Sequence, residues 1–182
     1  MSASVKRRRN HARRPSMPTL SISLERQEDT NLCWAAVSLA ILDHYRKYNH
    51  GFPSTQQELA NMFTNGRNEQ FDIFDVLDYY KVSNGSRPGF RQDELIDSIK
   101  NDEPAVIKTG SGGNGHFLLV IGYRKDAIEG FQLELRDPRS PSTSIFSKPR
   151  DIAGLQGILF TKIPPTPVTS SARKCPCPCV IM

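Results

Sequence analysis

The sequence predicts an α+β fold, and two features support this prediction. Over residues 33–100, apolar side chains recur at intervals of three and four positions, the spacing of helices with a buried face. Beyond Pro104 the pattern changes to short runs rich in Val, Ile, Leu and Phe, bounded by Gly, Pro and Asp, which is typical of strands. Helices followed by strands favour a domain with separate helical and sheet halves. At 182 residues the chain is long enough for one such domain, with a core that needs no disulfide.

The two ends of the chain differ in composition from the part between them. Residues 1–19 contain six basic and no acidic side chains, so we expect a disordered basic leader. Residues 164–182 are rich in Pro, Ser and Thr and bury too little apolar surface to fold, so we expect a linker and tail there. The folded body is therefore predicted to span residues 20–163. The net charge of +5 lies in the ends, and no apolar run is long enough to cross a membrane or to act as a secretory signal.

The body is expected to begin with a short strand and a buried helix. Residues 20–24 alternate between apolar and polar side chains and predict the strand. The helix is expected to begin at Cys33, with one buried face, and to end near Tyr48. Asp29 and Thr30 precede it as candidate N-caps, so Cys33 would lie in its first turn.

Three more helices are expected before the strands. Ser54 and Gln57 form a capping box that opens the second helix, and Asn65-Gly66 ends it. The apolar residues at 71–80 and at 92–100 predict the third and fourth helices.

Five strands are expected in the second half of the body. They are predicted at residues 105–109, 117–123, 131–135, 143–146 and 158–163. A turn at residues 126–130 would join the second and third of them into a hairpin.

Cys33 is a candidate nucleophile. It is the only cysteine ahead of residue 175, so the body offers it no disulfide partner. In the first turn of a helix, unpaired backbone N–H groups and the positive end of the helix dipole favour an anion. A cysteine at such a position beside a basic partner can have a lowered pKa, which makes the thiol a nucleophile near neutral pH.

A thiol nucleophile needs a base nearby, and His116 is the histidine that can supply it. His11 lies in the leader. His44 and His50 lie toward the far end of the Cys33 helix, at least eleven residues or roughly 16 Å from the thiol at 1.5 Å per residue. His116 follows a glycine-rich loop and begins a strand, where a sheet can present it to the end of a helix.

An acid on the neighbouring strand would hold this base in the correct tautomer. Asp137 follows the strand at 131–135, and the hairpin would bring it beside His116. Asp126, at the hairpin turn, is a competing candidate. The glycine-rich loop at residues 110–115 precedes a strand rather than a helix, which disfavours a phosphate-binding loop and leaves room for a substrate backbone beside the histidine.

Four short motifs resemble those of the papain-like cysteine peptidases. They are Gln27, Cys33-Trp34-Ala35-Ala36, Gly115-His116-Phe117 with the strand that follows, and Asp137-Pro138. Within that superfamily they are most similar to the bacterial double-glycine leader peptidases and to the AvrRpt-type effector proteases of plant pathogens. The resemblance covers about residues 22–138.

This resemblance implies a papain-like α+β fold, in which a helical half carrying Cys33 packs on an antiparallel β-sheet half carrying His116 and Asp137. Cys33 would be the nucleophile, His116 the general base and then acid, and Asp137 the orienting residue of a Cys-His-Asp triad. Gln27 would form the oxyanion hole with the backbone N–H of Cys33. No metal and no cofactor is expected for this chemistry.

The carboxyl end predicts lipidation. The last four residues, Cys179-Val180-Ile181-Met182, fit the C-a-a-X pattern for prenylation, with Met at the position that usually selects a farnesyl group. Cys175 and Cys177 are candidates for palmitoylation, and Arg173-Lys174 adds positive charge. Together these weak anchors would hold the protein to an anionic membrane surface.

A lipidated peptidase with bacterial motifs suggests a role in a host cell. Prenyltransferases belong to eukaryotic cells, whereas the peptidase motifs are similar to bacterial ones. We therefore expect an effector that is secreted into a host cell, modified there by the host prenyltransferase, and held at the cytosolic face of a host membrane. Its substrate would be a host protein at that membrane.

Three other functions remain open at this point. A glutamine deamidase or transglutaminase would use the same triad, because a thiolate that attacks a peptide carbonyl can also attack a glutamine side chain. A catalytically inactive module of this fold could bind a partner at the membrane, but the intact Cys33, His116 and Gln27 argue against it. Nucleic-acid binding would rest on the leader alone, which has no interleaved aromatic side chains, while the body is not basic.

Overall fold

The first three helices lie in one half of the molecule and the strands form the other half, with the fourth helix packed on the sheet. The computed structural model describes residues 18–110 and 115–164. The predicted leader, the lipidation cysteines and most of the glycine-rich loop lie outside these residues. The elements are α1 (Cys33–His44), α2 (Gln56–Thr64), α3 (Ile73–Tyr79), β1 (Ser83–Pro88), α4 (Gln92–Lys100), β2 (Ala105–Thr109), β3 (His116–Asp126), β4 (Gly130–Arg136), β5 (Ser144–Ser147), a 3-10 turn (Pro149–Asp151) and β6 (Gly157–Thr161).

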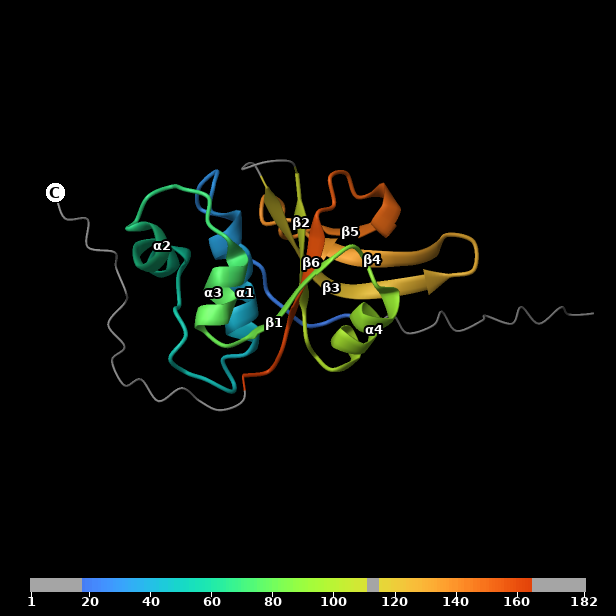
Figure 1. The fold of residues 1–182 in the computed structure, drawn as a ribbon, viewed down its shortest axis with the longest axis horizontal. Helices are drawn as coiled ribbons and strands as arrows, with labels where there is room; N and C mark the ends of the chain where they lie inside the picture. Colours follow the sequence, from blue (N-terminus) through green and yellow to red (C-terminus); the bar gives the residue numbers. More distant parts are fainter. Residues whose placement is uncertain (1–17, 111–114, 165–182) are drawn as a thin grey trace, which may run out of the picture.

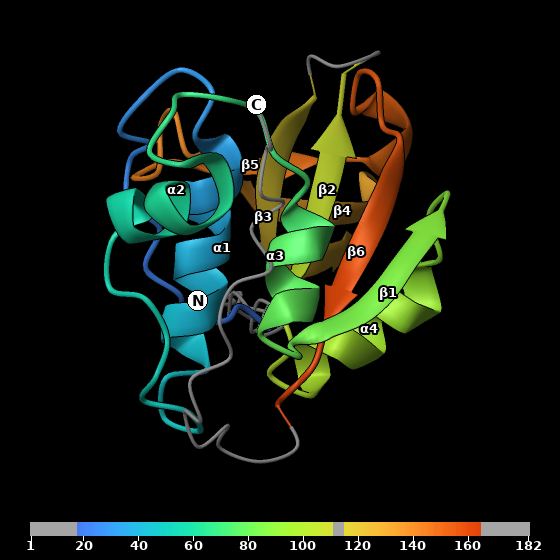
Figure 2. The ribbon, with the colours of Figure 1, turned by 60° about the vertical axis from the view of Figure 1, so that its left-hand side comes forward.

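The sheet has six strands in the order β1-β6-β2-β3-β4-β5, and every neighbouring pair is antiparallel. Figure 1 shows α1, α2 and α3 gathered on one side of the molecule, while the hairpin of β3 and β4 extends to the other. Helix α1 packs on β3 and α3 packs on β1. Figure 2 shows α3 in front of the sheet and α4 behind β1. The α+β prediction is confirmed.

Helix α1 is buried on all sides, so the expectation of one buried face is wrong. Every residue from 33 to 42 is buried, because α2, α3 and β3 surround the helix. The helix also ends earlier than predicted, at His44. Its N-cap is Leu32, which makes no side-chain hydrogen bond, so Asp29 and Thr30 do not cap it. The Asp29 carboxylate instead accepts the backbone N–H of Thr30 within the preceding loop, at 2.7 Å.

The other helices follow the predicted pattern with small shifts. The cap of α2 is Thr55 rather than Ser54: Thr55 Oγ1 accepts the N–H of Glu58, and the Glu58 carboxylate accepts the N–H of Ser54. The capping box is therefore one residue later than predicted, because Thr55 is the last extended residue before the helix. Asn65 ends α2 in the left-handed conformation, as expected. Helix α4 has the predicted bounds.

Two strands differ from the prediction. Strand β1 was not expected, because its sequence is polar and contains Gly and Pro; it is an exposed edge strand held by β6. Residues 20–24 alternate in burial as predicted but form no strand. The pairing with β3 stops at Leu20: Thr19 bridges to Gly122, the N–H of Leu20 donates to Ile121 O, and the N–H of Tyr123 donates to Pro18 O.

Within the described residues, no helix is long and apolar enough to span a bilayer. In that same part of the chain, no group of three or more His, Cys, Asp or Glu side chains is arranged to hold a metal ion.

Candidate active site

Cys33 is the first residue of α1, and its side chain faces the start of β3. Both segments lie at the same end of the molecule (Figure 1). Burial raises the pKa of the Cys33 thiol above its ordinary value, while the backbone N–H groups of Phe117 and Trp34 and the charge of Arg139 act to lower it. The expected net lowering by the helix terminus is therefore wrong, because desolvation outweighs it. The thiol is neutral until a base removes its proton.

His116 is the first residue of β3, and Asp137 follows the last residue of β4. The antiparallel pairing of Leu119 with Arg136 brings these two strand ends together. His116 Nε2 lies 2.8 Å from Asp137 Oδ1, and the two side chains are 14% and 23% exposed. The same carboxylate oxygen accepts the backbone N–H of Arg139 at 2.8 Å, which fixes its orientation.

Asp126 lies far from this pair, although it was a competing candidate. It is the last residue of β3, ten residues from His116 or roughly 33 Å along an extended strand. Its carboxylate accepts the backbone N–H groups of Glu129 and Ile128 in the hairpin turn, and these bonds lower the pKa of Asp126. Asp126 is therefore a turn residue.

The second ring nitrogen of His116, Nδ1, is buried and has no hydrogen-bond partner among the described residues. Because Nε2 faces a carboxylate, it carries the proton, and Nδ1 is left with a lone pair. The next residue, Phe117, directs its backbone N–H at the Cys33 sulfur. The free nitrogen and the thiol thus lie at the same strand end.

The backbone of Gln27 is hydrogen-bonded to the turn that follows Asp137. Its N–H donates to Pro138 O at 2.9 Å. Its side-chain Nε2 donates to Asp29 O at 2.7 Å and Thr30 O at 3.0 Å, while Oε1 is buried without a partner in the described part of the chain. In this structure both amide hydrogens of Gln27 are directed into the loop that precedes α1.

Two residues beside Cys33 hold a second loop against the site, and sequence reasoning missed their partners. Trp34 is fully buried, and its Nε1 donates to Glu69 O at 2.9 Å. Asn31 donates two hydrogen bonds to Asn68, from its backbone N–H to Oδ1 at 3.0 Å and from its Nδ2 to the backbone oxygen at 3.1 Å. The positions of Trp34 and Asn31 close to Cys33 could have indicated that these two residues support the site. Nothing in the sequence identified residues 68 and 69 as their partners.

A cavity of about 190 Å³ opens at the thiol, between the helical half and the sheet. Its walls come from the start of α1, the loop ahead of α3, and strands β2 and β3. The lining residues are Cys33, Trp34, Gln70, Phe71, Asp72, Lys108, Gly115 and Phe117. A substrate in this cavity would lie against the sulfur and beside both neighbours of His116.

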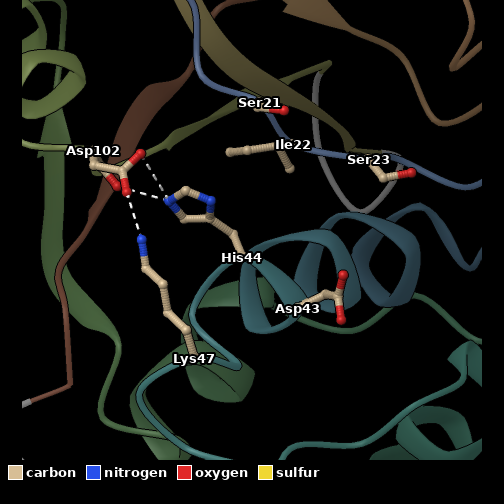
Figure 3. Close-up of a pocket in the computed structure, with 7 residues that line it drawn as sticks. All are labelled: Ser21, Ile22, Ser23, Asp43, His44, Lys47 and Asp102. Atoms are coloured by element: carbon tan, nitrogen blue, oxygen red, sulfur yellow. Dashed lines mark hydrogen bonds and ion pairs between the residues drawn. The ribbon is translucent and has the colours of Figure 1, made fainter.

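A second polar cavity lies at the opposite end of α1 (Figure 3). There His44 Nε2 lies 2.8 Å from the backbone oxygen of Asp102, and Lys47 Nζ lies 3.0 Å from the Asp102 carboxylate. These contacts fasten the end of α1 to the turn that precedes β2. His44 is therefore occupied far from the thiol, as its position in the sequence predicted.

Comparison with known proteins agrees with this geometry. The model of the Peptidase_C39 like family matches residues 19–150. The chain belongs to this family. No curated protein matches it. As a Peptidase_C39-like protein of this fold, it is a papain-like cysteine peptidase, a hydrolase.

Solved structures share the fold at low sequence identity. A protein described as a C39-like peptidase from Bacillus anthracis is 15% identical, with a TM-score of 0.57 over 81% of this chain and 98% of that one. The peptidase domain of Streptococcus ComA, a bi-functional ABC transporter, is 19% identical, with a TM-score of 0.52 over 76% and 95%. The bromelain protease of Ananas comosus is 14% identical, with a TM-score of 0.51 over 78% and 93%. The predicted papain-like fold is confirmed.

Proposed function

We propose that this C39-like protein is a thiol endopeptidase in which Cys33, His116 and Asp137 form the catalytic triad. One observation carries the proposal. The imidazole of His116 is held by Asp137 at 2.8 Å through Nε2, while the buried Nδ1 is free and the adjacent Phe117 N–H faces the sulfur of Cys33. A base with a fixed tautomer and an available lone pair is what a buried, neutral thiol requires.

In the proposed reaction, Nδ1 of His116 takes the thiol proton as the sulfur attacks the carbonyl carbon of a peptide bond. A C–S bond forms, and the carbonyl electron pair moves onto oxygen. The imidazolium then gives its proton to the leaving amine, the C–N bond breaks, and a thioester remains. A water molecule that gives a proton to the same Nδ1 hydrolyses the thioester, and the proton returns to the sulfur as the acid product leaves.

The negative oxygen of the intermediate needs donors that are already in place. The backbone N–H of Cys33 lies in the first turn of α1, where helix N–H groups have no partner within the helix. We propose that Gln27 supplies the second donor when bound substrate draws one of its two N–H groups away from the loop carbonyls of Asp29 and Thr30.

Mass spectrometry of a peptide library incubated with the full chain under reducing conditions tests the function, with Cys33→Ala as the control. Cleavage by the wild type that disappears in the variant is the expected result. A mass increase of about 1 Da at glutamine residues, dependent on Cys33 and without cleavage, would instead indicate a deamidase on the same triad. Absence of any Cys33-dependent product would contradict both activities and favour a binding module.

We further propose that the peptidase acts as a bacterial effector in a host cell, prenylated at Cys179 and palmitoylated at Cys175 or Cys177. The C-a-a-X ending and the neighbouring cysteines and basic residues support this proposal. Lipid anchors would concentrate the enzyme near membrane-bound host proteins without changing its chemistry.

Expression of the wild type and Cys179→Ser in eukaryotic cells tests the anchor. The wild type should be found in the membrane fraction and carry a prenyl group, and the variant should be found in the soluble fraction. An unchanged membrane fraction in Cys179→Ser would refute prenylation as the anchor. Cys33→Ala is the matched control, because it should alter activity and leave the membrane fraction as it is.

A further inference from the structure

A larger cavity adjoins the one at the thiol. This distal cavity has a volume of about 410 Å³ and lies between the start of α3 and strands β1, β2, β3 and β6. Asp72, Lys108 and Phe117 line both cavities. The two cavities therefore adjoin at these three residues, and the distal cavity lies on the side away from Cys33.

The deep part of the distal cavity is apolar. The residues that line it include the buried Ile73, Val106, Phe117 and Leu159. Its volume lies within the range of roughly 300–1,000 Å³ that is typical of ligand pockets in proteins. A large apolar side chain of a bound peptide that enters this cavity would itself be removed from water.

The rim of the distal cavity carries an excess of positive charge. Arg87 on β1 is exposed and forms no ion pair with any described residue; its guanidinium reaches only its neighbour's backbone oxygen, Ser86 O, at 3.4 Å. Lys108 pairs with Asp72, but the 3.7 Å separation is long and the two side chains are 40% and 50% exposed. An exposed ion pair of this kind is weak. Two cations therefore face one acid along this wall.

Lys108 is held at the boundary between the two cavities. In the sheet it lies opposite Phe117 on β3 and Gly157 on β6. Its Nζ lies 5.7 Å from the centre of the Phe117 ring, a cation–π distance. Its aliphatic stem passes Gly115, where an added Cβ would come within 3.2 Å of Lys108 Cε. The charge thus lies over the residue whose N–H faces the Cys33 sulfur.

We infer that Lys108 selects peptide substrates that carry an acidic side chain close to a large apolar one, near the bond to be cut. The substrate carboxylate replaces Asp72 as the partner of Lys108, with Arg87 adding attraction, while the apolar side chain enters the distal cavity. The exchange costs Asp72 little, because its Oδ1 still accepts the N–H of Phe74 as the N-cap of α3. This inference rests on the proposed peptidase function and names its substrate class.

Paired peptides that differ only by Glu or Gln test this selection. The peptides are built on a sequence that the library shows to be cleaved, and each position around the cut is varied in turn. The wild type should prefer Glu at one position by roughly threefold to fivefold in kcat/KM, the range of a partly exposed charge pair, and the preference should shrink at high salt.

Two substitutions should change the Glu/Gln ratio in opposite directions. Lys108→Gln should bring the ratio close to one. Asp72→Asn should raise it, because the internal competitor of the substrate is lost while an Asn can still cap α3. Lys125→Gln is the matched control, because Lys125 is exposed near the far end of β3 and should leave the ratio unchanged.

If the Asp72–Lys108 pair has only a structural role, both substitutions should change the Glu/Gln ratio in the same direction or leave it unchanged, and either result would overturn the inference. A wild type that cleaves peptides through Cys33 without preferring an acid at any position would overturn it too, and would leave the proposed peptidase intact. A wild type with no Cys33-dependent cleavage would refute the peptidase and the selection together. Thermal unfolding of each variant separates loss of folding from loss of selection.

Discussion

Asp137 and Asp126 are chemically identical, and only their surroundings distinguish them. Asp137 accepts from His116 Nε2 and from the Arg139 N–H, whereas Asp126 accepts two backbone N–H groups of a turn. If Asp137 orients the base, Asp137→Ala should lower kcat/KM by about 10²-fold or more. Asp137→Asn should retain part of the activity, because an amide oxygen still accepts the Nε2 proton.

Measured kcat/KM values for peptide cleavage by the wild type and the two Asp137 variants test this role of Asp137, with Asp126→Asn as the matched control. The control should keep nearly full activity, since the turn that Asp126 closes lies at the far end of the hairpin. An equal loss in Asp126→Asn and Asp137→Ala would contradict the assignment of Asp137.

Arg139 acts on the thiol through its charge. Burial raises the pKa of Cys33, and Arg139 is one of the groups that oppose this rise. Removing the positive charge should therefore raise the pKa further and reduce the thiolate fraction at a given pH. In Arg139→Gln, the pH midpoint for alkylation of Cys33 by iodoacetamide should move upward. Arg150→Gln, an exposed arginine away from the thiol, is the control; a midpoint that stays or falls in Arg139→Gln would contradict this electrostatic role.

At the scale of elements, a chain of two buried hydrogen bonds through the hydroxyl groups of Tyr45 and Thr161 joins α1 to the sheet. Thr161 Oγ1 on β6 donates to Pro104 O at 2.6 Å, so Tyr45 at the end of α1 must donate to Thr161 at 2.7 Å. Burial raises the pKa of Tyr45, which keeps its hydroxyl protonated. The helix that begins at Cys33 is thereby fixed to β6, the strand next to β2.

Tyr45→Phe should lower the free energy of unfolding by about 1–2 kcal/mol, because Thr161 loses a buried donor. Urea unfolding measures the change. Tyr79→Phe should have little effect, since the Tyr79 side chain is partly in solvent. Equal free energies of unfolding for Tyr45→Phe and the wild type would show that the hydrogen bond from Tyr45 to Thr161 makes no net contribution to stability.

Helix ends and edge strands were the least predictable elements. The cap of α2 moved from Ser54 to Thr55 because both residue types cap well and the choice depends on backbone geometry. Strand β1 carries no apolar alternation, so only its pairing with β6 makes it a strand. Residues 20–24 have the alternation, but backbone pairing with β3 does not extend past Leu20.

At the scale of the whole molecule, the segment ahead of α1 is fastened to the sheet half. Thr19 and Leu20 pair with the backbone of β3, and the N–H of Gln27 donates to Pro138 in the turn that follows Asp137. Gly122 permits this path: an added Cβ would lie 2.8 Å from Pro18 O and 3.0 Å from the Glu134 carboxylate. The N-terminal segment can lie against the sheet only where no side chain intervenes.

Gly122→Ala should therefore lower the free energy of unfolding by about 1–3 kcal/mol, the usual cost of overpacking. Amide hydrogen exchange should be faster in residues 18–24 than in the wild type, because the segment is pushed off β3. Gly51→Ala is the control, since its added Cβ would meet only the end of the Asn49 side chain at 3.3 Å. Unchanged exchange in residues 18–24 of Gly122→Ala would refute the close contact.

The sequence by itself determined the α+β order of the elements and singled out Cys33, His116 and Asp137 as candidates. Helical and strand periodicity, and position relative to a helix start or a strand end, are local properties that can be read along the chain. Only the tertiary structure decided that Asp137 rather than Asp126 contacts His116. It also decided that the side-chain amide of Gln27 donates to the loop ahead of α1, and that burial raises the pKa of the Cys33 thiol. It alone also placed Lys108 between two cavities. These outcomes depend on distances and desolvation set by segments far apart in sequence, which no local pattern encodes.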